Sequence, residues 1–126
     1  MSDELRSLAP PRLADDAHKG QAGRVLILAG SRNMPGAAVL VARGALRGGA
    51  GLVSAGCLDA ALMTILPITV PEAVLVDLSR LSDLPFALEA GGYHALVAGP
   101  GIGRGGRGAE LVRYLLQASL ELPLVL

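Results

Sequence analysis

Apolar residues are grouped along the chain in blocks whose lengths match strands and helices. Five short apolar runs, mostly bounded by glycine or proline, have the composition of buried parallel strands. They cover residues 25–29, 52–57, 73–78, 95–98 and 124–126. Segments with helical spacing or capping residues lie between them, at residues 37–47, 60–66, 82–90 and 109–119. The pattern therefore predicts strands that alternate with helices.

Individual residues set the expected ends and faces of these helices. Asp59 is a suitable N-cap for the second helix, which we expect to end before Pro67. Ser82 or Asp83 opens the third helix, and a Gly-Gly pair at 91–92 stops it. In the first helix, arginines 43 and 47 share one exposed stripe, and its other positions are so apolar that we expect most of its circumference to be buried.

The alternation of strands and helices predicts an α/β fold with three layers, αβα, around a mainly parallel sheet. Ligands in such folds bind beyond the carboxyl ends of the strands. Two glycine-rich loops follow strands 25–29 and 95–98, so we expect them to lie at the same edge and share a site. We interpret residues 1–18 as a polar N-terminal arm and expect residues 19–126 to form one domain. The chain stops inside an apolar run, which predicts a truncated domain.

Composition narrows the classes of function. Eleven basic and eleven acidic side chains cancel, and aromatic residues make up only 2% of the chain. Without a basic patch or stacking platforms, we expect no nucleic-acid partner. The most apolar region, 60–78, is broken by Pro67, Pro71 and Glu72, so we expect no membrane span. A single cysteine, Cys57, excludes an internal disulfide and suits a cytoplasmic protein.

The second glycine loop, "GPGIGRGG", fits the dinucleotide-binding pattern G-x-G-x-x-G through Gly101, Gly103 and Gly106. Glycines there let main-chain N–H groups approach a pyrophosphate. Pro100 inside the turn, and the position of the motif after the fourth strand, depart from a conventional nicotinamide-cofactor site. The expected acidic residue would be Glu121, which precedes a strand instead of ending one. A glycine-rich turn without a ligand is the alternative.

The first loop, "AGSRNMPGAA", is not a P-loop because Ala37 and Ala38 replace the Lys-Ser/Thr pair. Small residues at the helix start either admit a flat ligand or allow tight packing, and the sequence leaves both open. His18 and His94 lack partners at ligand spacing and are interpreted as loop histidines, and Cys57 as a buried thiol. We therefore predict no catalytic residue and no metal site within the chain.

Three segments together resemble one family. They are "HKGQAGRVLILAGSRNMPGAAVLVARGALRGGAGLVSAG" (18–56), "PEAVL" (71–75) and "ALVAGPGIG" (95–103). In order and spacing they are similar to the ADP/ATP-dependent NAD(P)H-hydrate dehydratases, which have a ribokinase-like fold related to carbohydrate kinases. The resemblance implies a lyase that repairs hydrated NADH or NADPH, with ADP or ATP as phosphoryl donor and Mg²⁺. It also implies that the substrate pocket is lined by Gly36, Ala37, Gly99, Gly101 and Gly103.

The resemblance covers only the half of those enzymes that binds the substrate. Their Asp-Ala-Asp, His-Pro-Gly-Glu, nucleotide-binding and catalytic-aspartate segments would all lie beyond Leu126. We therefore expect the 126-residue chain alone to be inactive and to self-associate as a homo-oligomer. The alternatives are a non-catalytic nucleotide-binding half-domain and a sugar or vitamin kinase of the same fold.

Overall fold

The computed structural model describes residues 23–126 except 104 and 119, so the predicted arm, with His18, lies outside the described residues. Strands and helices alternate along the chain as predicted, with a short 3-10 turn before the third helix. The elements are β1 (Arg24–Leu28), α2 (Pro35–Arg47), β2 (Leu52–Cys57), α3 (Ala60–Thr69), β3 (Val74–Asp77), η1 (Leu81–Asp83), α4 (Leu84–Gly91), β4 (Ala95–Ala98), α5 (Arg107–Gln117) and β5 (Leu124–Val125). None of the helices described is both long and apolar enough to cross a membrane.

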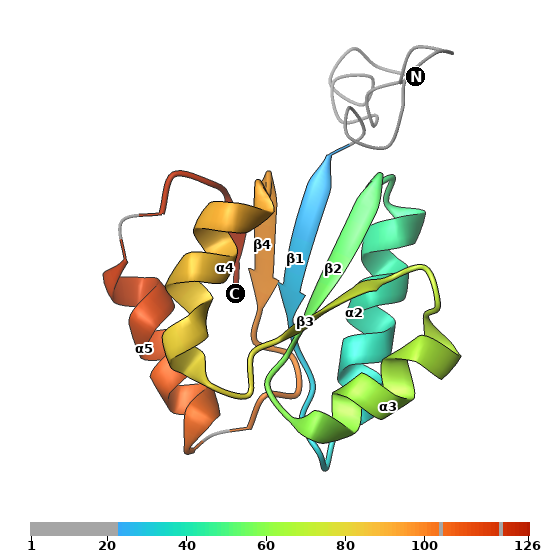
Figure 1. Ribbon diagram of the computed structural model, residues 1–126, viewed down its shortest axis with the longest axis horizontal. Helices are drawn as coiled ribbons and strands as arrows, with labels where there is room; N and C mark the ends of the chain where they lie inside the picture. The colour runs from blue at the N-terminus through green and yellow to red at the C-terminus, as the bar shows by residue number, and fades with distance from the viewer. Residues whose placement is uncertain (1–22, 104, 119) are drawn as a thin grey trace, which may run out of the picture.

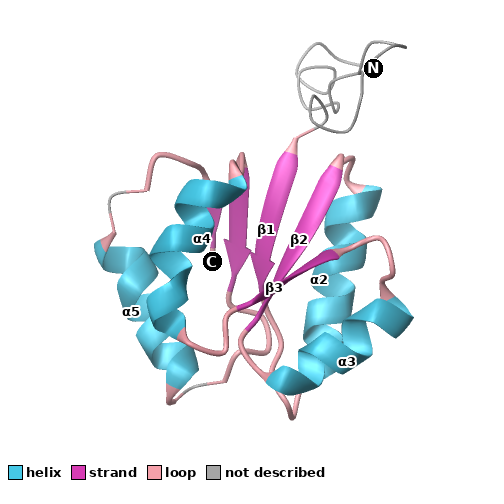
Figure 2. Cartoon of the chain, in the orientation of Figure 1, coloured by secondary structure: helices cyan, strands magenta, loops and turns pink. Residues whose placement is uncertain are grey.

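The five strands form one parallel sheet in the order β3-β2-β1-β4-β5. Helices α2 and α3 cover one face and α4 and α5 the other, which gives the predicted three layers (Figure 1; Figure 2). The chain moves outward from β1 to β3 and then returns to place β4 on the other side of β1. The direction of winding therefore reverses between β1 and β4.

The sequence of β1 explains why the sheet has a core on each face. Successive side chains of a strand point to opposite faces. Leu26 and Leu28 belong to the cluster under α4 and α5, whereas Ile27 between them belongs to the cluster under α2 and α3. All three side chains are at most 1% exposed. The continuous apolar run is thus the signature of a strand covered on both sides.

The end predicted for α3 was wrong. Asp59 caps the helix as expected, since its Oδ1 accepts a hydrogen bond from the Ala61 N–H at 2.9 Å. The helix continues through Pro67 to Thr69, however. Leu62 and Leu66 are fully buried, and this anchoring holds the last turn in place although proline cannot donate its own helical hydrogen bond.

The burial predicted for α2 was also too extensive. Arginines 43 and 47 are exposed as expected, but only Ala38 and Ala42 are buried. Leu40 is 72% exposed because the outer side of α2 faces no other described element. The helix is buried along one stripe, where it meets β1, β2 and α3.

The start of α4 differs from the prediction, and β5 is an edge strand. Residues 81–83 form a 3-10 turn before α4, whose first turn carries a proline, and Gly92 ends α4 in the left-handed conformation. Strand β5 pairs with β4 alone among the described residues, so it lies at an edge of this sheet. Val125 is therefore 62% exposed.

Candidate functional site

The loops that follow β1 and β4 touch each other at the carboxyl edge of the sheet. The Gly30 N–H donates a hydrogen bond to the Pro100 carbonyl oxygen at 2.8 Å. A β-carbon added to Gly101 would overlap that of Ala37 and lie 3.3 Å from the Gly30 Cα. The prediction that both loops lie at one edge is confirmed. They also flank the point where the winding of the sheet reverses, which is the usual ligand position in such folds.

The five residues expected at the substrate pocket fall into two groups. Gly36 and Ala37 lie in the first turn of α2, while Gly99, Gly101 and Gly103 lie in the β4–α5 loop with φ angles of 129°, 73° and 89°. Ala37 and Gly101 contact each other, so loop packing already requires both to be small. Gly36 and Gly103 have open space where a β-carbon would stand. Among the five predicted residues, these two leave the most room for a ligand to reach the main chain.

The third glycine of the dinucleotide pattern has a structural role at the start of α5. Gly106 is the N-cap of this helix with a φ of 59°, which favours glycine. Two residues later, Gly108 is buried, and a β-carbon there would lie 2.6 Å from the Ile102 carbonyl oxygen. The pattern is therefore present in the expected loop between strand and helix. Gly108, which the pattern does not include, allows the helix to pack on the loop.

A hollow of about 300 Å³ opens beside these loops. Its walls come from the segments that follow β1, β2 and β4 and from the start of α5. The lining residues are Gly30, Ser31, Leu58, Asp59, Ile102, Gly105, Arg107 and Gly108. An Nη of Arg107 donates a hydrogen bond to the Leu58 carbonyl oxygen at 2.6 Å and so ties α5 to the β2–α3 connection.

Ser31, Asp59 and Arg107 were not predicted as site residues. Asp59 was recognised only as a helix cap, and nothing in the sequence pairs Arg107 with the end of β2, 49 positions away. The one available signal was that each of these residues follows a predicted strand, at the edge where ligands bind.

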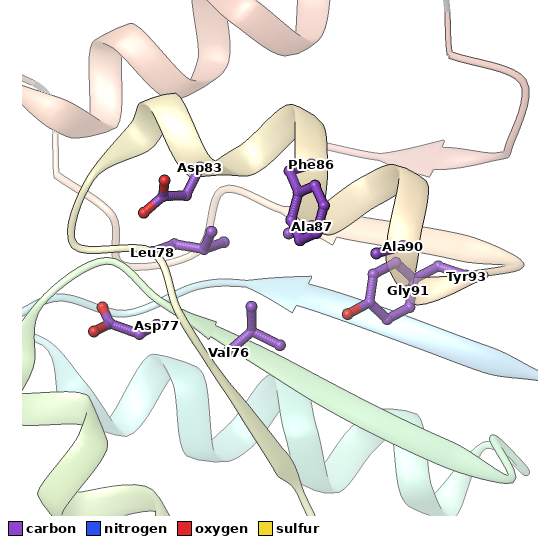
Figure 3. A pocket seen from close by; sticks show the side chains of 9 residues that line it. All are labelled: Val76, Asp77, Leu78, Asp83, Phe86, Ala87, Ala90, Gly91 and Tyr93. Atoms are coloured by element: carbon purple, nitrogen blue, oxygen red, sulfur yellow. The ribbon is translucent and has the colours of Figure 1, made fainter.

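A second hollow, of about 360 Å³, lies between β3 and α4 (Figure 3). Asp77 and Asp83 flank one end, and Tyr93 lines the other. The Asp77 carboxylate accepts a hydrogen bond from the Ser79 N–H at 3.0 Å, which lowers the pKa of that carboxyl. This hollow includes neither glycine loop and none of the predicted site residues. We therefore place the candidate site at the loops.

The remaining reactive side chains have structural roles. The side-chain Nδ1 atom of His94 accepts a hydrogen bond from the main-chain N–H of Arg24. The main-chain N–H of His94 in turn donates to the carbonyl oxygen of Arg24. The thiol of Cys57 is 1% exposed, and burial, followed by the nearby Asp77 carboxylate, raises its pKa to about 11. In the part of the chain described, no three potential metal ligands gather. The site offers main-chain groups and arginine charge, which suit binding of an anionic ligand.

Comparison with known proteins identifies the family. A family model described as NAD(P)H-hydrate dehydratase matches residues 25–126. The chain belongs to this family. Among NAD(P)H-hydrate dehydratases, the ADP-dependent enzyme of Listeria monocytogenes is 32% identical over 111 residues, which are 88% of this chain and 39% of that protein. The ATP-dependent enzyme of Aedes aegypti is 38% identical over 92% of this chain and 36% of its own length.

Solved structures confirm the ribokinase-like fold of this NAD(P)H-hydrate dehydratase family member. A ribokinase-like superfamily protein from Enterococcus faecalis superposes with a TM-score of 0.81 at 23% identity, covering 98% of this chain and 43% of that one. The Bacillus subtilis ADP/ATP-dependent NAD(P)H-hydrate dehydratase, co-crystallized with ATP/Mg²⁺, superposes with a TM-score of 0.71 at 28% identity over 97% and 42%. The chain thus spans about two fifths of the length of the relatives named here.

Proposed function

We propose that this chain supplies the substrate side of an ADP- or ATP-dependent dehydratase that repairs hydrated NADH and NADPH. The observation that carries the proposal is the contact between the two glycine loops at the reversal point of the sheet, in a member of this family. Relatives of this chain are named for the same activity. In the reaction, the nucleotide phosphorylates the hydroxyl of the hydrated ring, and loss of phosphate with a ring proton restores the double bond.

Within that reaction, the role of this chain is to bind the substrate. Gly36 and Gly103 leave the main chain open to a flat ring or a phosphate, and the Ala37–Gly101 contact holds the loops together. Among the described residues that line the hollow, the one carboxylate, Asp59, already accepts a hydrogen bond from the Ala61 N–H and lies 3.8 Å from Arg32, while His94 and Cys57 are engaged elsewhere. We propose that the groups for phosphoryl transfer and Mg²⁺ binding are not among the described residues of this chain.

The sugar- or vitamin-kinase alternative is less consistent with the first loop. A kinase of this fold would need polar side chains directed toward the substrate hydroxyls. At the helix start, Ala38 is 1% exposed and Ala37 packs on Gly101. We further propose that the protein works in the cytoplasm and self-associates, since it has one buried thiol and an exposed edge strand, β5.

The test compares the 126-residue chain alone with the same chain joined to the C-terminal remainder of the Bacillus subtilis relative. Recovery of NADH absorbance from hydrated NADH is measured with ADP or ATP and magnesium. We expect turnover by the joined protein and none by the chain alone. Turnover by the chain alone would disprove the proposal that this chain only binds the substrate. Failure of a folded joined protein to bind hydrated NADH would disprove the proposed function.

A further inference from the structure

The hollow beside the glycine loops is lined by a positively charged side chain, that of Arg107. Neither the sequence motifs nor the proposed binding residues include it. Arg107 begins α5 directly after the second glycine loop, and its side chain crosses to the end of β2. The residue is exposed, so its guanidinium can be reached from solvent. Arg107 therefore lines a hollow formed by three loops at the ligand-binding edge.

The guanidinium of Arg107 is held in place before any ligand arrives. One Nη donates to the Leu58 carbonyl oxygen at 2.6 Å. A guanidinium has five N–H donors in a fixed planar arrangement, so further donors remain for a second partner. Because the side chain is already ordered, less conformational entropy is lost when such a partner binds. Two parallel N–H groups match the oxygen spacing of a phosphate.

The charges around the hollow favour an anion. Asp59 is the only carboxylate among the lining residues, and two partners offset its charge. Its Oδ1 accepts from the Ala61 N–H at 2.9 Å and lies 3.8 Å from Nε of Arg32. Arg32 and Arg107 together therefore exceed the single negative charge. Gly105, which has open space where a β-carbon would stand, adds a stretch of wall without a side chain, where an anion can approach the main chain.

From these observations we propose that Arg107 is a binding residue for a phosphate group, and that this group belongs to the diphosphate bridge of the dinucleotide. The proposal rests on the proposed function for the identity of the ligand, but the phosphate-binding role is defined by the hollow itself. The nicotinamide end of the substrate would then extend from the hollow toward Gly36 and Gly103.

The test measures binding of NADH, inorganic pyrophosphate and reduced nicotinamide riboside to the 126-residue chain by calorimetry. We expect Arg107→Gln to weaken NADH and pyrophosphate binding by about tenfold or more and to leave riboside binding unchanged, since the riboside has no phosphate. The salt dependence of NADH affinity should also become shallower. Arg107→Lys, which keeps the charge, should restore part of the affinity.

Arg43→Gln is the matched control. Arg43 is also exposed and also donates to a main-chain carbonyl, that of Thr69, at 3.0 Å. Thr69 ends α3, at the opposite end of that helix from Asp59. This variant should bind all three ligands as the unmodified chain does. It therefore corrects for the loss of one arginine and one tertiary hydrogen bond.

The outcomes separate this proposal from the proposed function. Equal weakening of NADH and riboside by Arg107→Gln would show that Arg107 only positions the β2–α3 connection, and would overturn the proposal. Unchanged NADH and pyrophosphate affinity would overturn it too, as would the absence of pyrophosphate binding to the unmodified chain. If the chain bound pyrophosphate through Arg107 but bound neither NADH nor hydrated NADH, the proposed function would fail while the phosphate site stood.

Discussion

The methyl group of Ala37 faces the α-carbon of Gly101 so closely that a β-carbon at position 101 would overlap it. This contact joins the first turn of α2 to the β4–α5 loop, across 64 positions of sequence. Each residue is small because of the other, and the contact fixes the distance between the two loops. The shape of the candidate site therefore depends on packing as well as on open main chain.

Replacing Gly101 with alanine should destabilise the fold strongly. Its φ of 73° is unfavourable for a side chain, and the added methyl would collide with Ala37. We expect a loss of about 2–5 kcal/mol in the free energy of unfolding, measured by urea denaturation. Gly103→Ala is the control, because φ is 89° there but the space is open. It should cost only about 1–2 kcal/mol, and equal losses would contradict the packing role.

Replacing Gly36 with alanine should separate binding from stability. Gly36 is exposed, lies in α2 and has open space around it, so alanine should raise stability by about 0.5–1 kcal/mol. The same methyl would stand where we propose that the ligand meets the main chain. Affinity for hydrated NADH, measured by calorimetry, should fall by about tenfold or more.

The control for Gly36→Ala is Gly44→Ala. Gly44 lies in the same helix, is equally exposed and is equally free of neighbours. It should give a similar gain in stability with no change in affinity. Identical binding by the two variants would remove Gly36 from the site.

Replacing Pro67 with alanine should stabilise the protein. Pro67 is exposed within α3, so alanine loses little packing while it restores a helical hydrogen bond donor. We expect a gain of about 1–3 kcal/mol, reduced somewhat by the greater freedom of the unfolded chain. Thr64→Ala on the same helix should change stability by less than about 0.7 kcal/mol. A loss of stability in Pro67→Ala would mean that the proline itself shapes the last turn of α3.

The buried thiol of Cys57 should make stability fall at alkaline pH. Its pKa is raised to about 11 in the folded protein from an ordinary value of 9.0. The unfolded chain therefore releases this proton first. The contribution to stability is fully present below about pH 9 and is lost as pH rises toward about pH 11. It amounts to about 2–3 kcal/mol.

Urea denaturation across that range, compared with Cys57→Ala, isolates the effect of the thiol from the titration of other groups. The variant should show a shallower decline in stability over the same interval. Parallel curves for the two proteins would refute the assignment.

The strands and the sheet edge could be predicted from sequence because each strand is an apolar run between turn residues. The ranges of β2 and β4 are those expected from the pattern. The end of α3 could not be predicted, because the signal of Pro67 is local whereas the burial of Leu62 and Leu66 depends on the folded sheet. Arg107 was missed for a related reason. Its hydrogen bond to the Leu58 carbonyl forms only when α5 and β2 meet in space.

The reversal of winding between β1 and β4 also has a consequence for the order of folding. Arg24 and His94, whose hydrogen bonds mark the start of this strand pair, are 70 positions apart, whereas β1 and β2 are separated only by α2. Closing the longer loop costs more chain entropy, and the βαβ unit at the N-terminal end can form without it. The contact between the two glycine loops depends on the later pairing of β4 with β1. On the ribosome, half of the sheet can therefore be assembled before any surface exists that could capture a dinucleotide.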